Sequence, residues 1–284
     1  MSGRDTNFYY SFLVLPAEKR RAVVAIWDFC RAVDDATDEV QEAGQADAAG
    51  ELARWRRELA ACFADGRPET SQGRALMPFV SRFNLPRQSF EALIEGVEMD
   101  LVPRRYENFD ELYEYCIRVA SAVGLICLEI FGYRDPRSRQ YAIELGVALQ
   151  LTNILRDVPG DLARGRIYIP QTDLRQFGCT ENDLLGEAAN AGSGVQSKTV
   201  KSVLQHQARR ARDYYARAAG TLPPADARQL VAAEIMGAIY RAILDRIERR
   251  DFDVFSSVVR IPRPRRALIA AATWGRTMLG SVPR

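Results

Sequence analysis

Histidine is almost missing from this chain: one residue, His206, occurs among 284. Histidine-rich zinc sites, facial triads and Ser–His relays are therefore excluded as a basis for its chemistry. A metal bound here would be held by oxygen ligands, which favours a hard cation such as magnesium.

Cysteine is also sparse and unpatterned. The five cysteines are odd in number and form no C-x-x-C pair, which is typical of reduced thiols rather than a disulfide framework. The start of the chain lacks a basic stretch followed by an apolar run, and the longest near-apolar run, residues 119–128, is too short to cross a bilayer. We therefore expect a cytoplasmic protein.

An excess of charge of one sign is absent too, because the formal net charge is only +2. This balance gives no reason to expect a nucleic-acid partner, and no partner protein is evident. Four arginines nevertheless crowd residues 260–266. We interpret this stretch as a solvated tail; the alternative is attraction to anionic lipid headgroups, which would make the protein peripheral to the membrane.

Alternating β-type patterns are nearly lacking, the best being RIYIP at residues 166–170. Helical periodicity predicts helices instead. They are expected over residues 17–40, 50–65, 75–83, 87–100, 109–131, 135–158, 197–219, 225–251 and 263–277. No composition shift marks a linker, so the pattern predicts one all-α domain over residues 1–284, with eight to ten helices.

Two of these helices, residues 117–133 and 142–155, are apolar on nearly all sides. Such helices belong in the centre of a bundle. Both contain several small residues, among them Ala120, Gly124 and Gly146. Small side chains allow close helix packing, which we favour here, or leave room for a long apolar ligand.

Two clusters of carboxylates stand out against this apolar background. Asp34 and Asp38 are four residues apart with Asp35 between them, and Asp157 and Asp161 repeat the spacing. Residues four apart share a helix face, where like charges repel unless cations neutralise them. Two such clusters facing one another could hold several magnesium ions that grip a diphosphate. Arg31 and Arg156 would take the remaining diphosphate oxygens.

Pro159 lies between the second pair of carboxylates and is followed by Gly160. Proline lacks the N–H that a helix needs and clashes with the carbonyl four residues earlier. We therefore expect a kink or a loosened turn there, and expect Asp157 to matter more for turnover than Asp161.

Five segments together resemble the squalene/phytoene synthase family of head-to-head isoprenoid synthases. They are NFYYSFLVLP (7–16), AIWDFCRAVDDATDE (25–39), VEMDL (97–101), YCIRVASAVG (115–124) and ALQLTNILRDVPGDLARGRIYIP (148–170). Two departures from the family pattern are small: Asn7 replaces a usual serine and Trp27 a common tyrosine. The larger departure is Pro159-Gly160, which replaces a polar pair.

The resemblance implies an isoprenoid-synthase helical bundle around a central cavity that binds isoprenyl diphosphates and several Mg²⁺ ions. It implies the following roles. The catalytic residues would be Tyr115, Arg156 and Tyr240; the substrate-binding residues Asn7, Phe8, Arg31, Gln150, Asn153 and Arg156; and the metal ligands Asp34, Asp35, Asp38, Asp157 and Asp161.

The activity that the resemblance implies is release of diphosphate during 1′-1 condensation of two allylic diphosphates. We favour two farnesyl diphosphates giving presqualene diphosphate. The alternatives are a phytoene synthase that condenses two geranylgeranyl diphosphates and a non-catalytic isoprenoid-binding protein of the same fold. Use of NADPH stays open, since no G-x-G-x-x-G follows a strand and reductive members of the family do not rely on that fingerprint.

Overall fold

The computed structural model describes residues 9–42, 48–64, 66–190 and 197–280, without the side chains of residues 37–42 and 48. Asn7 and Phe8 and the side chain of Asp38 thus lie outside the described part. The helices are α1 (Tyr9–Leu13), α2 (Ala17–Glu42), α3 (Ala48–Phe63), α4 (Ser71–Arg82), α5 (Arg87–Glu98), α6 (Phe109–Cys116), the π-helical turn η2 (Ile117–Ser121), α7 (Ala122–Phe131), α8 (Arg137–Ala163), α9 (Gln171–Gln176), α10 (Glu181–Ala189), α11 (Lys198–Thr221), α12 (Val231–Arg249) and α13 (Arg263–Met278).

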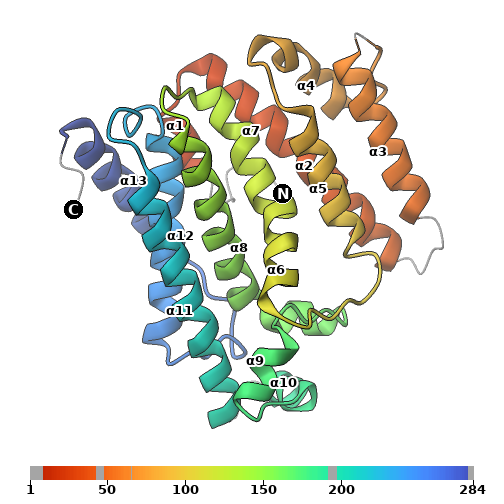
Figure 1. Cartoon of the computed structure of the whole chain (residues 1–284), viewed down its shortest axis with the longest axis vertical. Coiled ribbons are helices and arrows are strands. Elements are labelled where there is room, and N and C mark those ends of the chain that lie inside the picture. Colours follow the sequence, from red (N-terminus) through yellow and green to blue (C-terminus); the bar gives the residue numbers. More distant parts are fainter. Residues whose placement is uncertain (1–8, 43–47, 65, 191–196, 281–284) are drawn as a thin grey trace.

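The predicted all-α class is confirmed (Figure 1). Three short helices, α1, α9 and α10, were not predicted, so the described residues form thirteen α-helices rather than the expected eight to ten. The predicted helix 109–131 contains the π-helical turn η2. The β-type run 166–170 forms only an isolated bridge, between Arg105 and Ile167. Within the described residues, no helix combines the length and apolar character that a membrane span requires.

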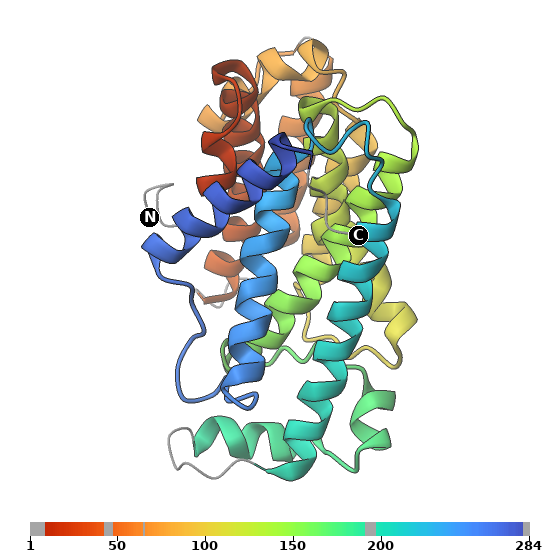
Figure 2. The same ribbon diagram turned by 90° about the vertical axis from the view of Figure 1, so that its left-hand side faces the viewer.

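The centre of the bundle is α8, which packs against α7, η2, α11 and α12. In Figure 1, α2 to α5 lie on one side of α7 and α8, and α11 to α13 lie on the other. Gly146 of α8 meets η2 closely, because a Cβ atom at this position would lie 2.6 Å from Ser121 Cα. The last helix, α13, packs against α12 and α1 and crosses the outside of the bundle (Figure 2).

Helix α8 continues through Pro159 to Ala163, so the proline, where a kink or a loosened turn is expected, does not end the helix. Proline removes one backbone hydrogen bond, but Val158 and Leu162 on either side of it are buried in the core. Burial of these two side chains favours the helical turn that carries both. Asp157 and Asp161 therefore share one continuous helix, which gives no ground for ranking Asp161 below Asp157. Their relative importance for turnover remains a prediction.

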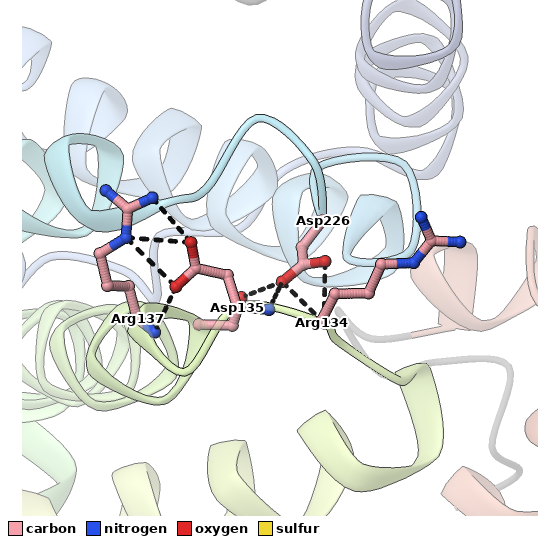
Figure 3. A network of polar contacts seen from close by, with 5 residues as sticks. Arg134, Asp135, Arg137 and Asp226 are labelled. Atoms are coloured by element: carbon pink, nitrogen blue, oxygen red, sulfur yellow. Dashed lines mark hydrogen bonds and ion pairs between the residues drawn. The ribbon is translucent and has the colours of Figure 1, made fainter.

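The buried carboxylate of Asp226 joins two connections at the N-terminal end of α8 (Figure 3). One is the connection between α7 and α8, and the other is the connection between α11 and α12, which contains Asp226. It accepts hydrogen bonds from the backbone N–H groups of Arg134 (2.9 Å) and Asp135 (3.0 Å) and from the Ser138 hydroxyl (2.7 Å). Burial alone would raise the pKa of Asp226, but these hydrogen bonds outweigh it and lower the pKa. The contact fixes the start of α8 against the turn before α12.

Replacing this carboxylate tests its contribution to stability. Asp226→Ala leaves two backbone N–H groups and the hydroxyl of the buried Ser138 without this acceptor, and a buried group left unsatisfied costs about 1–3 kcal/mol. We expect the free energy of unfolding to fall by roughly 2–4 kcal/mol in urea denaturation. Arg137→Ala removes a neighbouring side chain that is 72% exposed and should leave the midpoint unchanged. Equal urea midpoints for Asp226→Ala and Arg137→Ala would contradict a stabilising role of the Asp226 carboxylate.

Candidate active site

A cavity of about 1090 Å³ runs along one face of α8, from Tyr141 near its start to Asp161 near its end. These residues are twenty positions apart, which at 1.5 Å per residue corresponds to about 30 Å. Residues from α1, α2, α5, α6, η2, α7 and α12 also line the cavity, together with Asp100 and the segments 164–168 and 258–266.

The predicted site residues that the structure describes all line this cavity. They are Arg31, Asp34, Asp35, Tyr115, Gln150, Asn153, Arg156, Asp157, Asp161 and Tyr240. They come from α2, α6, α8 and α12, so the fold brings together residues that are up to 209 positions apart in the chain. Their roles remain predictions.

One face of α8 carries three side chains whose oxygen atoms could bind a metal ion. They lie at successive turns: Asn153, Asp157 and Asp161. The Asn153 Oδ1 atom is buried and accepts no hydrogen bond. Asp157 pairs with the adjacent Arg156, whose Nε lies 2.7 Å from Asp157 Oδ1. A buried acceptor beside two carboxylates is a donor set suited to a hard cation.

The Asp161 carboxylate shows the electrostatic cost of this arrangement. Burial, followed by the nearby charge of Asp157, raises its pKa to about 7. Arg166 and Arg164 oppose this shift without cancelling it. Asp161 is thus held in surroundings that disfavour its charged form until a cation is supplied.

Asp34 and Asp35 of α2 line the same cavity, and the Arg31 Nε donates to Asp35 Oδ2 at 3.2 Å. No three acidic, histidine or cysteine side chains converge as a ready-made metal cluster among the residues described. Mg²⁺ does not need one, because it binds through one or two carboxylates, water and substrate phosphates. The carboxylates of α2 and α8 therefore fit Mg²⁺ brought together with a diphosphate.

Arg156 is a firmly anchored cation of the site. Burial would lower its pKa, but hydrogen bonds to Asp157 and to the Tyr240 hydroxyl outweigh burial and raise it. The guanidinium therefore stays charged beside the cavity while only 17% of its side chain is exposed. A fixed, poorly solvated positive charge is well suited to stabilise a departing diphosphate.

Asp100 and Tyr168 also line the cavity, but the sequence analysis did not identify them as site residues. Both lie in segments that carry the family resemblance. Asp100 accepts hydrogen bonds from the hydroxyls of Tyr115 (2.7 Å) and Tyr168 (2.8 Å). The two rings stack with centroids 5.0 Å apart. Burial and then the charge of Asp100 raise the pKa of Tyr115 well above its usual value, so the phenol stays protonated.

The arginines near the C-terminus are not simply a solvated tail, which corrects that interpretation. Arg260, Arg263 and Arg266 line the cavity, and Arg266 is 7% exposed, with its guanidinium 5.7 Å from the Tyr10 ring centre. The first turn of α13 carries this side chain inward against the bundle. Only Arg265 of the four is exposed without lining the cavity.

The other end of the cavity is apolar. Ala120, Gly124 and Gly146 line it, so small residues both pack closely and leave room for a ligand. At the limit of the cavity, the Tyr141 hydroxyl donates to Glu234 Oε1 at 2.6 Å. The cavity therefore has a charged end and an apolar end, as an amphipathic substrate would require.

Comparison with known proteins agrees with this geometry. The family described as "Squalene/phytoene synthase" matches residues 1–266. The chain belongs to the squalene/phytoene synthase family. It is similar to the 15-cis-phytoene synthase of Synechococcus elongatus, with 40% identity over 270 residues that cover 90% of this chain and 84% of the relative. It is also 36% identical to the 15-cis-phytoene synthase of Synechocystis, over 96% of this chain and 82% of the relative.

Solved structures of the squalene/phytoene synthase family share the fold. A dehydrosqualene synthase superimposes with a TM-score of 0.83 at 26% identity, covering 98% of this chain and 93% of that one. The squalene synthase HpnC of Alicyclobacillus acidocaldarius gives a TM-score of 0.74 at 31% identity, over 87% and 89%. The expected family and prenyl-transferring enzyme class are thereby confirmed, and head-to-head condensation of prenyl groups is supported.

The continuity of α8 leads to a prediction about the two aspartates of this squalene/phytoene synthase. Asp157→Ala and Asp161→Ala should each lower Mg²⁺-dependent diphosphate release by roughly 100-fold or more, the scale of losing one preorganised group at a charge-stabilising site. Asp213→Ala, an exposed carboxylate of α11, serves as the control. An Asp161 variant close to wild type would restore the view that Pro159 displaces this residue.

The raised pKa of Asp161 also predicts a pH dependence for metal binding. Below a pKa of about 7 the carboxyl is protonated, so an incoming cation must displace a proton. Mg²⁺ affinity, measured by titration calorimetry with inorganic diphosphate present, should therefore fall as the pH drops through 7 and rise above it. Asp161→Asn should flatten this dependence; an unchanged profile in that variant would assign it to another group.

Proposed function

We propose that the protein is a phytoene synthase, which condenses two molecules of geranylgeranyl diphosphate head to head. The observation that carries this proposal is the 36–40% identity, over nearly the whole chain, to cyanobacterial proteins named 15-cis-phytoene synthase. These names favour the C20 substrate over the farnesyl diphosphate that the sequence alone led us to prefer.

The length of the cavity supports a C20 tail. Asp157 and Tyr141 are sixteen positions apart on α8, or about 24 Å. Four main-chain bonds of about 1.5 Å make an extended isoprene unit roughly 5 Å long, so a C20 tail measures roughly 20 Å. The volume of about 1090 Å³ also slightly exceeds the range of about 300–1,000 Å³ typical of sites for one small molecule, as two tails require.

In the proposed mechanism, the charged end of the cavity binds the diphosphates and the apolar end binds the tails. Mg²⁺ held by the aspartates of α2 and α8 would neutralise diphosphate charge and assist its departure. Arg156, oriented by Asp157 and Tyr240, donates hydrogen bonds to the leaving oxygens. Arg31 of α2, which also lines the cavity, supplies a second guanidinium.

The carbon skeleton forms where the two halves of the cavity meet. The C1–O bond of one substrate breaks, and its electron pair leaves on diphosphate. The C2–C3 double bond of the second substrate attacks this C1, and loss of a proton closes a cyclopropane. The apolar wall keeps water from the cation, and aromatic faces are suitable neighbours for it because they do not trap it.

Tyr115, Tyr168 and Asp100 offer a route for the departing proton. Each phenol donates to Asp100, so the lone pairs of the Tyr115 oxygen remain available to accept a proton, and its own proton can pass to Asp100. Departure of the second diphosphate, rearrangement and loss of another proton then give phytoene. No reductant enters this balance, so NADPH is not required for the proposed product.

Product analysis tests the proposal. The purified protein is incubated with Mg²⁺ and either geranylgeranyl or farnesyl diphosphate, each with and without NADPH, and extracts are analysed by mass spectrometry. We expect a C40 hydrocarbon from the C20 substrate without NADPH, and none after chelation or in Asp157→Ala. A much higher kcat/KM for farnesyl diphosphate, with presqualene diphosphate as product, would overturn the choice of substrate.

Formation of presqualene diphosphate is the second candidate. The observation in its favour is the structural similarity to proteins named dehydrosqualene synthase and squalene synthase. A binding protein without catalysis is distinguished in the same experiment, because it would release no diphosphate from either substrate.

A further inference from the structure

The outer side of α13 is apolar although it faces away from the bundle. Its exposed residues include Leu268 (70% exposed), Trp274 (46%) and Leu279 (83%), with Ala271 and Ala272 between them. We call these five residues the outer face. Large apolar side chains this exposed are uncommon among the described residues, and half of them lie within 258–279. Contiguous exposed apolar surface marks an interaction site.

The opposite side of α13 already has its partners. Arg266, Ala270 and Thr273 are buried against the bundle, and α13 contacts α12 and α1. Figure 2 shows the helix lying across the outside of the bundle. At 100° per residue, the outer face points away from these contacts, so packing among the described residues does not account for it.

The charge of this part of the chain is strongly one-sided. Residues 254–284 contain six of the 39 basic residues and none of the 37 acidic ones. Arg265 and Arg276 are eleven positions apart, which places them on the same flank of the outer face, and both are exposed. An apolar helix face bordered by arginines is complementary to a surface that has an apolar interior and anionic headgroups.

The outer face continues into the cavity wall. Val258, Arg260 and Arg263 line the cavity just before and at the start of α13. Val258 is also 57% exposed, so this segment borders both the cavity and the solvent. A surface that binds lipid here would place the bilayer beside this edge of the cavity.

We propose that the outer face of α13 docks on an anionic lipid bilayer, with the helix lying in the plane of the headgroups and Leu268, Trp274 and Leu279 inserted. A second copy of the chain is the competing occupant. In an isologous dimer the same patch would meet itself, so two arginine-rich segments without acidic residues would be brought together. Their repulsion favours the lipid surface.

Vesicle binding tests the proposal without any substrate, so its outcome is separate from that of the proposed function. The full chain is sedimented with vesicles of phosphatidylcholine alone or mixed with phosphatidylglycerol. We expect binding to the mixed vesicles only, and weakening at high salt. Equal binding to both kinds of vesicle, or to neither, would overturn the proposal.

Three variants separate the outer face from general effects. Arg265→Gln/Arg276→Gln should weaken binding roughly 10- to 30-fold, since each basic residue near an anionic surface contributes about a factor of five. Leu268→Ser/Leu279→Ser should weaken it at least as much. Leu185→Ser removes a leucine of α10 that is 46% exposed and should bind as wild type. If all three bind alike, the outer face is not the docking surface.

Trp274 provides a direct signal from the outer face. The chain has three tryptophans, of which Trp55 is buried and Trp27 half-buried at the cavity. Mixed vesicles should shift the fluorescence to shorter wavelength, and Trp274→Phe should remove this shift while sedimentation persists. Light scattering after size-exclusion chromatography tests whether a second copy of the chain occupies the outer face instead. A dimer that the leucine variants dissociate, with no effect on vesicle binding, would assign the face to self-association.

Turnover in detergent completes the test, because none of these variants alters a residue assigned to the cavity. Circular dichroism and detergent activity of the leucine variant should equal those of wild type. Loss of vesicle binding together with loss of fold would make that variant uninformative alone, and the arginine variant, which changes only exposed charges, then decides the proposal.

Discussion

The structure depends on holding carboxylates near the C-terminal end of α8, a central helix whose middle is buried in the core. Asp161 is buried enough, and near enough to Asp157, for its pKa to rise to about 7. A fold selected for stability alone would not keep such a pair beside the buried, partnerless oxygen of Asn153. Cations and a diphosphate would make the arrangement favourable, which is why we propose this end of α8 as the place where they bind.

This requirement explains features of the helices around α8. The contact between Gly146 and Ser121 brings η2 against α8. Tyr115 lies just before η2, at the place where π-helical turns often accompany functional sites. At the other end of α8, Asp226 holds the connection to α7 through two backbone N–H groups. The helix that presents the charged groups is thus fixed at its start by hydrogen bonds and along its length by close packing.

Local sequence patterns were sufficient to predict much of this arrangement. The i, i+4 carboxylates and the two helices that are apolar on all sides could be predicted because helical geometry alone decides which residues share a face. The family segments then indicated the residues that line one cavity in the structure. The chain length of the substrate was not decided in this way, because it depends on how far the helices stand apart along the whole cavity.

Other features depend on tertiary contacts, which no local pattern encodes. Asp100 follows α5 without an i, i+4 acidic partner such as Asp157 and Asp161 form, and only the fold brings Tyr115 and Tyr168 to its two oxygens. Arg266 lies in a basic run typical of an exposed tail, yet packing of α13 on α12 buries it. At Pro159, burial of Val158 and Leu162 overrides a local preference against helix.

The division of the cavity into two ends bears on how one fold can serve several chain lengths. Diphosphate departure imposes the same demands on every substrate of this class, so the carboxylates and arginines at the charged end have little freedom to vary. The apolar end meets only tail methyl groups, and its length is limited by side chains such as Tyr141, which is tied to Glu234 by a hydrogen bond of 2.6 Å. Chain length can therefore change through a few residues at this end while the fold and the charged end persist. This explains why proteins named phytoene synthase and structures named dehydrosqualene or squalene synthase match the same chain.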